Sequence, residues 1–110
     1  MLQCADQSAK LTILGASDVR TCAPWSELVG ALREGFRSET DVPLRHHHSI
    51  ACAQEERDNT LLLMPAWQSG GAMGVKMVSV VPSNGKRGLP AINSIYVLSD
   101  TTTGTIQAII

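Results

Sequence analysis

A single lysine, Lys76, lies within an otherwise apolar segment from Gly74 to Val81. The segment is rich in β-branched and apolar residues, so it is predicted to form a strand. Alternation along that strand places Lys76 on the same face as Val78 and Val80. Burying an unpaired ammonium is costly, so the amine needs an internal carboxylate or an anionic ligand. The alternative is a lysine whose aliphatic stem packs while its charge reaches water.

Arg45 is the second candidate, at the start of a predicted strand from Leu44 to Ala53. It lies two residues after Pro43, whose fixed backbone could aim the guanidinium. A guanidinium binds a carboxylate through two parallel hydrogen bonds. The alternative is a solvated surface arginine.

Three consecutive histidines, His46, His47 and His48, follow Arg45. On a strand only His46 and His48 share a face, and no cysteine or carboxylate stands nearby at a spacing typical of metal ligands. A structural or surface role is therefore favoured over a metal site. Lys86 and Arg87, in a predicted loop from Pro82 to Pro90, are read as a solvated tip, with phosphate contact as the alternative.

Composition limits the class of protein. The chain has 110 residues, of which 44% are apolar and 17% charged, and its formal charge is -1, which is typical of a packed globule. Charges of both signs interleave, so nucleic acid and anionic membranes are not expected as partners. Residues 1–10 lack the features of a secretory signal, which favours the cytosol. Three widely spaced cysteines, at positions 4, 22 and 52, are expected to be reduced thiols.

Periodicity predicts the elements that carry these residues. An apolar stripe with helical spacing predicts one amphipathic helix from Trp25 to Ser38, and Ser17 and Asp18 could cap a brief helical turn before it. Strands are predicted over residues 11–14, 44–53, 60–64, 74–81, 92–98 and 105–110, with a charged turn at 54–59 and a loop at 67–71. The expected fold class is α+β, with five to six mostly antiparallel or mixed strands packed against one main helix.

The chain ends at Ile110 inside an apolar β run, without the polar tail common at natural termini. We therefore expect a chain that stops before its domain is complete. The sequence contains neither a G-x-G-x-x-G turn for dinucleotide phosphates nor a G-x-S-x-G nucleophile motif.

Several short motifs, taken in order, resemble the ornithine cyclodeaminase and mu-crystallin family. The resemblance covers about Val42 to Ile110 closely and the preceding helix loosely. The motifs are VPLR at 42–45, LLLMP at 61–65, GVK at 74–76, PSN at 82–84, RGLP at 87–90, LSD at 98–100 and TG at 103–104. Their order and spacing, more than any single motif, carry the resemblance.

The resemblance implies that residues 1–110 form a substrate-binding and dimerisation domain, followed by a Rossmann domain that binds NAD(H) or NADP(H). It also implies that Arg45 and Lys76 hold the carboxylate of an α-imino or α-amino acid. A further arginine, in an arginine-threonine motif, is expected beyond Ile110. The implied protein is a homodimer, and this chain by itself is expected to bind no cofactor and to be inactive.

Two positions depart from the family pattern. Leu62 stands where the ornithine cyclodeaminases carry a glutamate that engages the substrate, and Ser94 stands where many relatives have glycine. Leu62 favours a reductase of cyclic ketimines such as Δ1-pyrroline-2-carboxylate or Δ1-piperideine-2-carboxylate over an ornithine cyclodeaminase. Lys76 would also serve as a catalytic residue if its pKa fell far enough for it to protonate the imine nitrogen. A non-catalytic binding module, as in mu-crystallin, and an inactive piece of an enzyme are the other hypotheses.

Overall fold

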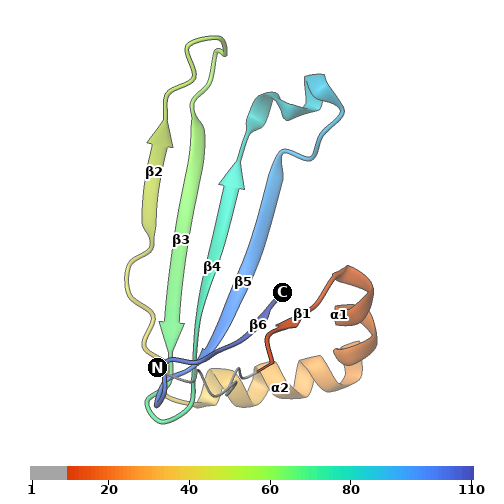
Figure 1. Cartoon of the computed structure of the whole chain (residues 1–110), viewed down its shortest axis with the longest axis vertical. Helices are drawn as coiled ribbons and strands as arrows, with labels where there is room; N and C mark the ends of the chain where they lie inside the picture. Colours follow the sequence, from red (N-terminus) through yellow and green to blue (C-terminus); the bar gives the residue numbers. More distant parts are fainter. Residues whose placement is uncertain (1–9) are drawn as a thin grey trace, which may run out of the picture.

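A computed structural model describes residues 10–110 of the chain. Six strands form one sheet in the order β1-β6-β5-β4-β3-β2 (Figure 1). The strands are β1 (Thr12–Ile13), β2 (His46–Ile50), β3 (Asn59–Trp67), β4 (Ala72–Val80), β5 (Ile92–Asp100) and β6 (Ile106–Ile109). Every neighbouring pair is antiparallel except β1 and β6, which are parallel. The predicted α+β class and the mixed sheet are confirmed.

In the described part of the chain, three helical segments accompany the sheet: α1 (Ala16–Cys22), α2 (Trp25–Arg37) and the 3₁₀ helix η1 (Pro82–Arg87). The predicted amphipathic helix corresponds to α2 and ends one residue earlier than expected, at a position where helix boundaries commonly vary. Pro24 precedes α2, and the N–H of Ser38 closes it by bonding to the Glu34 carbonyl at 3.1 Å. Within residues 10–110, every helix is too short or too polar to cross a membrane.

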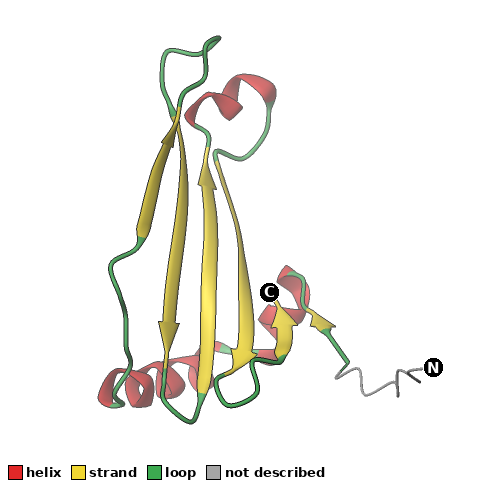
Figure 2. Ribbon diagram, turned by 60° about the vertical axis from the view of Figure 1, so that its left-hand side comes forward, coloured by secondary structure: helices red, strands yellow, loops and turns green. Residues whose placement is uncertain are grey.

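Helix α2 lies beside one end of the sheet rather than over its face (Figures 1 and 2). Two residues of its apolar stripe remain largely exposed, Trp25 at 81% and Phe36 at 89%. The segment after the helix is held to the sheet by Gln68, whose Nε2 donates to Ser38 Oγ at 2.7 Å and to Thr40 Oγ1 at 3.0 Å. The helix is therefore attached mainly at its carboxyl end.

Strands β2 and β3 differ from their predicted bounds. Strand β2 is shorter than the predicted 44–53, because its pairing with β3 extends only from His46 to Ile50. Strand β3 is longer than the predicted 60–64 and passes through Pro65 to Trp67. The register of β2 with β3 ends at Leu63, so Pro65 lies where the missing proline N–H removes no bond of that ladder.

Strands β4 and β5 and the short elements also differ from their predicted bounds. Strands β4 and β5 pair continuously from Ala72 opposite Asp100 to Val80 opposite Ile92, and this pairing extends β5 beyond the predicted Leu98. The predicted loop at 82–90 contains η1, and the predicted turn near Ser17 is the seven-residue helix α1. Strands β1 and β6 are each shorter than predicted.

Asp100 organises the turn that joins β5 to β6. Its Oδ1 accepts hydrogen bonds from the backbone N–H of Thr103 at 2.9 Å and of Thr102 at 2.7 Å. These donors lower the pKa of the exposed Asp100 carboxyl below its ordinary value of 3.8, with the Thr103 bond contributing most. Two amides at the start of the turn are thereby satisfied by one charged acceptor.

Replacing Asp100 with alanine should lower the melting temperature at pH 7. Because the folded-state pKa is depressed, the stabilisation is present above about pH 3.8 and is lost as the pH falls through the folded value. Thermal unfolding of both proteins at pH 7, 4 and 2.5 should therefore show a gap that closes toward low pH. Asp58→Asn, a change in another exposed loop, is the control; a gap for Asp100→Ala that stays constant with pH would contradict the assignment.

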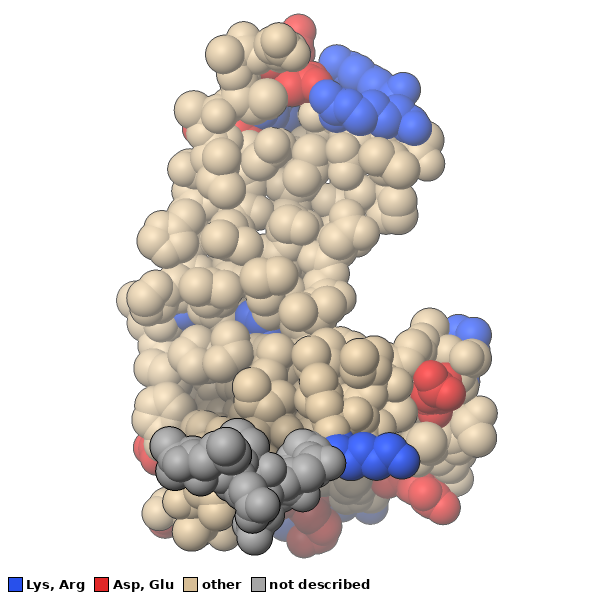
Figure 3. Space-filling view, in the orientation of Figure 1, with Lys and Arg blue, Asp and Glu red and all other residues tan. Residues whose placement is uncertain are grey.

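The sheet is covered sparsely by the rest of the described chain. Val78 at 6% exposure and Ala108 are its buried apolar residues within residues 10–110. Figure 3 shows that charged side chains gather toward the two ends of the molecule, while the surface over the strands between them is almost free of charge. Residues on each face of the sheet remain exposed, Lys76 and Ser94 on one face and Val75 and Met77 on the other.

Candidate functional site

Lys76 occupies the middle of a row of side chains that crosses the sheet. Its register partners are Met64 on β3 and Tyr96 on β5. Tyr96 is paired in turn with Ile110 through two backbone hydrogen bonds, of 2.8 and 2.9 Å. Residues directly opposite one another in antiparallel strands project to the same face. We call this face, which carries Met64, Lys76, Val78 and Tyr96, the Lys76 face.

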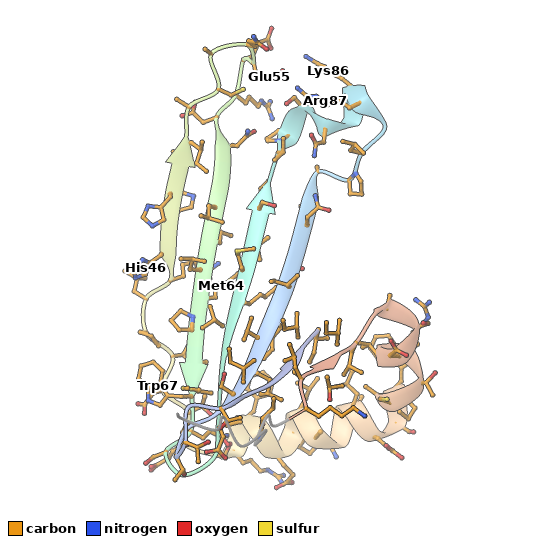
Figure 4. The ribbon with its side chains drawn as sticks, in the orientation of Figure 1. His46, Glu55, Met64, Trp67, Lys86 and Arg87 are labelled. Atoms are coloured by element: carbon orange, nitrogen blue, oxygen red, sulfur yellow. The ribbon has the colours of Figure 1, made fainter. Side chains whose placement is uncertain are left out.

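Arg45 lies at the outer end of the same row. It precedes β2 by one residue and, with Met64 and Pro65, lines a hollow of about 340 Å³. Continuing the β2–β3 register by one residue places Arg45 opposite Met64, whose position midway along β3 is marked in Figure 4. Arg45 and Lys76 thus flank one strand, with backbones about 10 Å apart. Both side chains are long and flexible, so their charged groups can converge above Met64.

The charges of Arg45 and Lys76 are not neutralised within the described chain. Lys76 is the single Lys, Arg, Asp or Glu residue of β2, β3 and β4. The two ion pairs found in residues 10–110 are Arg37–Glu34 and Arg87–Glu55, and neither involves the row. Both candidate residues are exposed, so water solvates them and an anion could replace that water. The internal carboxylate partner that the sequence suggested for Lys76 is thus not found in the described residues.

Beside Lys76 the surface is hollowed. Lys76, Ser94, Tyr96 and Ile110 line a hollow of about 550 Å³ together with residues of α1 and the segment before it. Helix α1 stands next to this hollow because Leu14 bonds to the Ile109 carbonyl at 2.8 Å, which extends the β1–β6 pairing up to the helix. Nothing in the sequence predicted this proximity.

The two positions that depart from the family pattern also lie on the Lys76 face. Leu62 pairs with Val78 and with His47, and it lies two residues along β3 from Met64 of the Lys76 row. Ser94 pairs with Val78 within an uninterrupted part of β5, so a serine there is compatible with regular strand geometry. The residue at 62 is therefore placed where it could contact a molecule held at Lys76, and in this chain it offers only an apolar side chain.

The histidines lie on both faces of β2. His46 and His48 share the face opposite Lys76, with ring centroids 5.8 Å apart, and His47 lies on the Lys76 face. Figure 4 shows His46 at the outer edge of the sheet. Residues 10–110 contain no cluster of three or more His, Cys, Asp or Glu side chains that could hold a metal ion. Cys22 and Cys52 are free thiols, and Cys4 lies outside the described residues.

The loop carrying Lys86 and Arg87 is not a simple solvated tip. Arg87 Nη2 forms an ion pair with Glu55 from the β2–β3 hairpin loop, and the Glu55 side chain is only 13% exposed. Figure 4 shows Glu55, Lys86 and Arg87 together at the end of the sheet away from α2. Arg87 Nη1 also reaches the Asn84 side chain at 3.4 Å. Lys86 and Arg87 are both exposed, as predicted for a solvated tip, and Arg87 also has a partner in a neighbouring loop that the sequence did not indicate.

No residue of the described chain is assigned to a dinucleotide. A dinucleotide-binding fold needs adjacent parallel strands joined through helices, with a glycine-rich turn at the phosphates. In residues 10–110 the only parallel pair is β1 with β6, the first and last strands along the described chain, which lie side by side at one edge of the sheet. The two cations of the row can attract an anion to this face of the sheet.

Comparisons with known proteins support the family resemblance seen in the sequence. The model of the ornithine cyclodeaminase/mu-crystallin family matches residues 9–110. A Δ1-pyrroline-2-carboxylate reductase from Bacillus thuringiensis is 35% identical over 105 residues, which cover 91% of this chain and 31% of the relative.

Two solved structures share the fold. The Δ1-pyrroline-2-carboxylate reductase of Thermococcus litoralis, in complex with NADH and L-proline, has a TM-score of 0.67 and 27% identity over 90% of this chain and 30% of its own. An archaeal alanine dehydrogenase dimer with bound NAD has a TM-score of 0.71 and 25% identity, again over 90% and 30%. The chain therefore spans about a third of the length of the proteins it matches.

Proposed function

The chain belongs to the ornithine cyclodeaminase/mu-crystallin family, and we propose that the protein carrying it reduces a cyclic ketimine acid with NADH or NADPH. The substrates we infer are Δ1-pyrroline-2-carboxylate and Δ1-piperideine-2-carboxylate. The observation that supports this proposal most is the row in which Arg45 and Lys76 lie on either side of Met64, two exposed cations without an ion-pair partner in residues 10–110. The similarity to a Δ1-pyrroline-2-carboxylate reductase supports the substrate class.

In this proposal residues 1–110 form the substrate-binding and dimerisation domain. Arg45 and Lys76 bind the substrate carboxylate and so fix the neighbouring imine carbon, which turns the reaction into a positioned step. Reduction adds a hydride to the imine carbon and a proton to its nitrogen, and the dinucleotide, held by residues outside this domain, supplies the hydride. Because it draws on reduced dinucleotide, we propose a cytoplasmic location.

We also propose that the protein is a homodimer that associates through the sheet face opposite Lys76. That face carries a compact group of half-exposed apolar side chains: Leu61, Leu63, Val75, Met77, Ile95 and Val97. Contiguous apolar surface of this kind marks an interaction site. A self-complementary sheet face would leave both Lys76 faces free for substrate.

The function is tested with the complete protein encoded by the gene. Imine-dependent oxidation of NADPH and of NADH is followed spectrophotometrically with each cyclic ketimine, and ammonia release from L-ornithine is measured beside it. We expect imine reduction without ammonia release, because Leu62 cannot act as an acidic substrate contact. Ammonia release with proline formation would establish the cyclodeaminase activity instead.

A non-catalytic binding role is separated by calorimetry. The complete protein is titrated with L-proline, a stable mimic of the imino acid, with and without the dinucleotide. Binding in both titrations together with no turnover of either imine would overturn the reductase and leave a binding module. We expect turnover, with binding that depends on Arg45 and Lys76.

A further inference from the structure

Tyr96 is the residue of the Lys76 row whose place the sequence did not single out. Its backbone N–H and C=O are both bonded to Ile110, so they point away from β4. The Tyr96–Lys76 pair is therefore of the non-hydrogen-bonded kind, in which opposite Cα atoms approach to about 4.5 Å and the side chains lie closest. Whatever Lys76 binds comes within reach of the tyrosine ring.

The ring of Tyr96 occupies the space where residue 74 would carry a side chain. A Cβ atom added to Gly74 would lie 1.9 Å from Tyr96 Oη and 2.2 Å from Cζ. Gly74 is buried and has no positive φ, so glycine is required here for space and not for backbone conformation. The hydroxyl end of the tyrosine ring thus lies over Gly74 of β4, two residues along the strand from Lys76.

The seated ring lies between two hollows of the Lys76 face. One, of about 550 Å³, is shared with Lys76 and Ser94, and the other, of about 260 Å³, is shared with Ala66 and Gly74. A molecule whose carboxylate is held at Lys76 therefore meets Tyr96 as the wall toward the second hollow. The Tyr96 side chain is apolar except for its hydroxyl, so it suits contact with the methylene groups of a cyclic substrate.

We propose that Tyr96, seated on Gly74, is a substrate-contacting residue that sets which ring size of cyclic ketimine acid the protein accepts. The inference rests on the proposed function and extends it from substrate class to selectivity. The five- and six-membered imines differ by one methylene, and one methylene against a protein wall changes kcat/KM by about 10- to 200-fold. Moving or removing the ring changes the room available to that methylene.

The test is the ratio of kcat/KM for Δ1-pyrroline-2-carboxylate to kcat/KM for Δ1-piperideine-2-carboxylate in the complete protein. This ratio is independent of the fraction of active enzyme, so a loss of folding alone does not move it. Tyr96→Ala should shift the ratio at least tenfold toward the six-membered ring, whereas Tyr96→Phe, which keeps the wall, should leave it unchanged. Where turnover is too slow, calorimetric affinities for L-proline and L-pipecolate give the same comparison.

Gly74→Ala provides an independent route to the same contact, because the new methyl group and the tyrosine ring cannot share one space. It should change the ratio in the wild-type background and have no further effect in the Tyr96→Ala background. Gly85→Ala is the matched control, because a Cβ there meets nothing within 4 Å. Its ratio should equal that of the wild type.

The outcomes separate the two proposals. If the wild type reduces neither imine, the proposed function fails and this inference fails with it. If the wild type is active and both Tyr96→Ala and Gly74→Ala keep its ratio, only the role of Tyr96 is overturned. An equal loss of kcat/KM for both rings, with the ratio unchanged, would show a purely structural tyrosine and would likewise overturn the inference.

Discussion

Replacing Arg45 or Lys76 with alanine should lower kcat/KM for a cyclic ketimine acid by about 10- to 100-fold in each case. A hydrogen bond to a charged partner contributes about 1.5–3 kcal/mol, and each 1.36 kcal/mol corresponds to a factor of ten. Both residues are exposed at the surface of the sheet and take part in no ion pair of the described chain, so their removal should leave the fold intact. Steady-state kinetics of the complete protein measure the effect.

The nature of the lost interaction can be tested through the substrate. The methyl ester of the imine lacks the carboxylate charge, so the wild type should use it poorly and the two variants should lose little further activity with it. Arg45→Lys should fall between wild type and Arg45→Ala, because lysine retains the charge without the two-pronged geometry of a guanidinium.

Matched controls remove the same charges elsewhere. Arg33→Ala on α2 and Lys86→Ala on η1 lie away from the Lys76 row, and both should retain wild-type kinetics. Unchanged kcat/KM in both Arg45→Ala and Lys76→Ala would overturn the assignment of the carboxylate site.

The sequence predicted the elements better than it predicted their neighbours. The apolar stripe of α2 and the alternation around Lys76 are local patterns, so a short window contains the information and both predictions were confirmed. Strand ends were less predictable, because pairing decides them. Ser99 and Asp100 belong to β5 since β4 continues opposite them, and nothing in their own residue types indicates it.

The candidate site shows the same division. Arg45 and Lys76 could be proposed from their types and surroundings, but their alignment across Met64 depends on the register of β2 with β3 and of β3 with β4, which residue types alone do not set. Tyr96 was missed because its significance depends on Gly74, a residue of the neighbouring strand. The Tyr96 ring occupies the space that a side chain at position 74 would fill. Aligning the predicted strands β4 and β5 would have placed Tyr96 opposite Lys76, two residues from Gly74 on the same face. That alignment is the signal that could have identified Tyr96.

Placing a charge on the apolar sheet face should separate the proposed homodimer into monomers. Met77 lies between Leu63 and Ile95 on the face opposite Lys76, and it is 42% exposed in the single chain. Met77→Glu would bury an unpaired carboxylate in the interface, at a cost of about 3–5 kcal/mol. In a symmetric dimer each substitution occurs twice, so the dissociation constant should rise by at least 100-fold. Sedimentation equilibrium across a range of protein concentrations measures this change directly.

Leu89→Glu is the control for this experiment. Leu89 is 55% exposed and lies in the loop between η1 and β5, outside the apolar group, so its replacement adds the same charge without touching the proposed interface. It should leave the dimer intact. The Met77→Glu monomer should bind a fluorescent apolar dye more strongly than the wild type, because the face that the partner covered becomes exposed. A Met77→Glu protein that remains a dimer with unchanged affinity would place the interface elsewhere, and the exposed stripe of α2, with Trp25 and Phe36, would be the next surface to mutate.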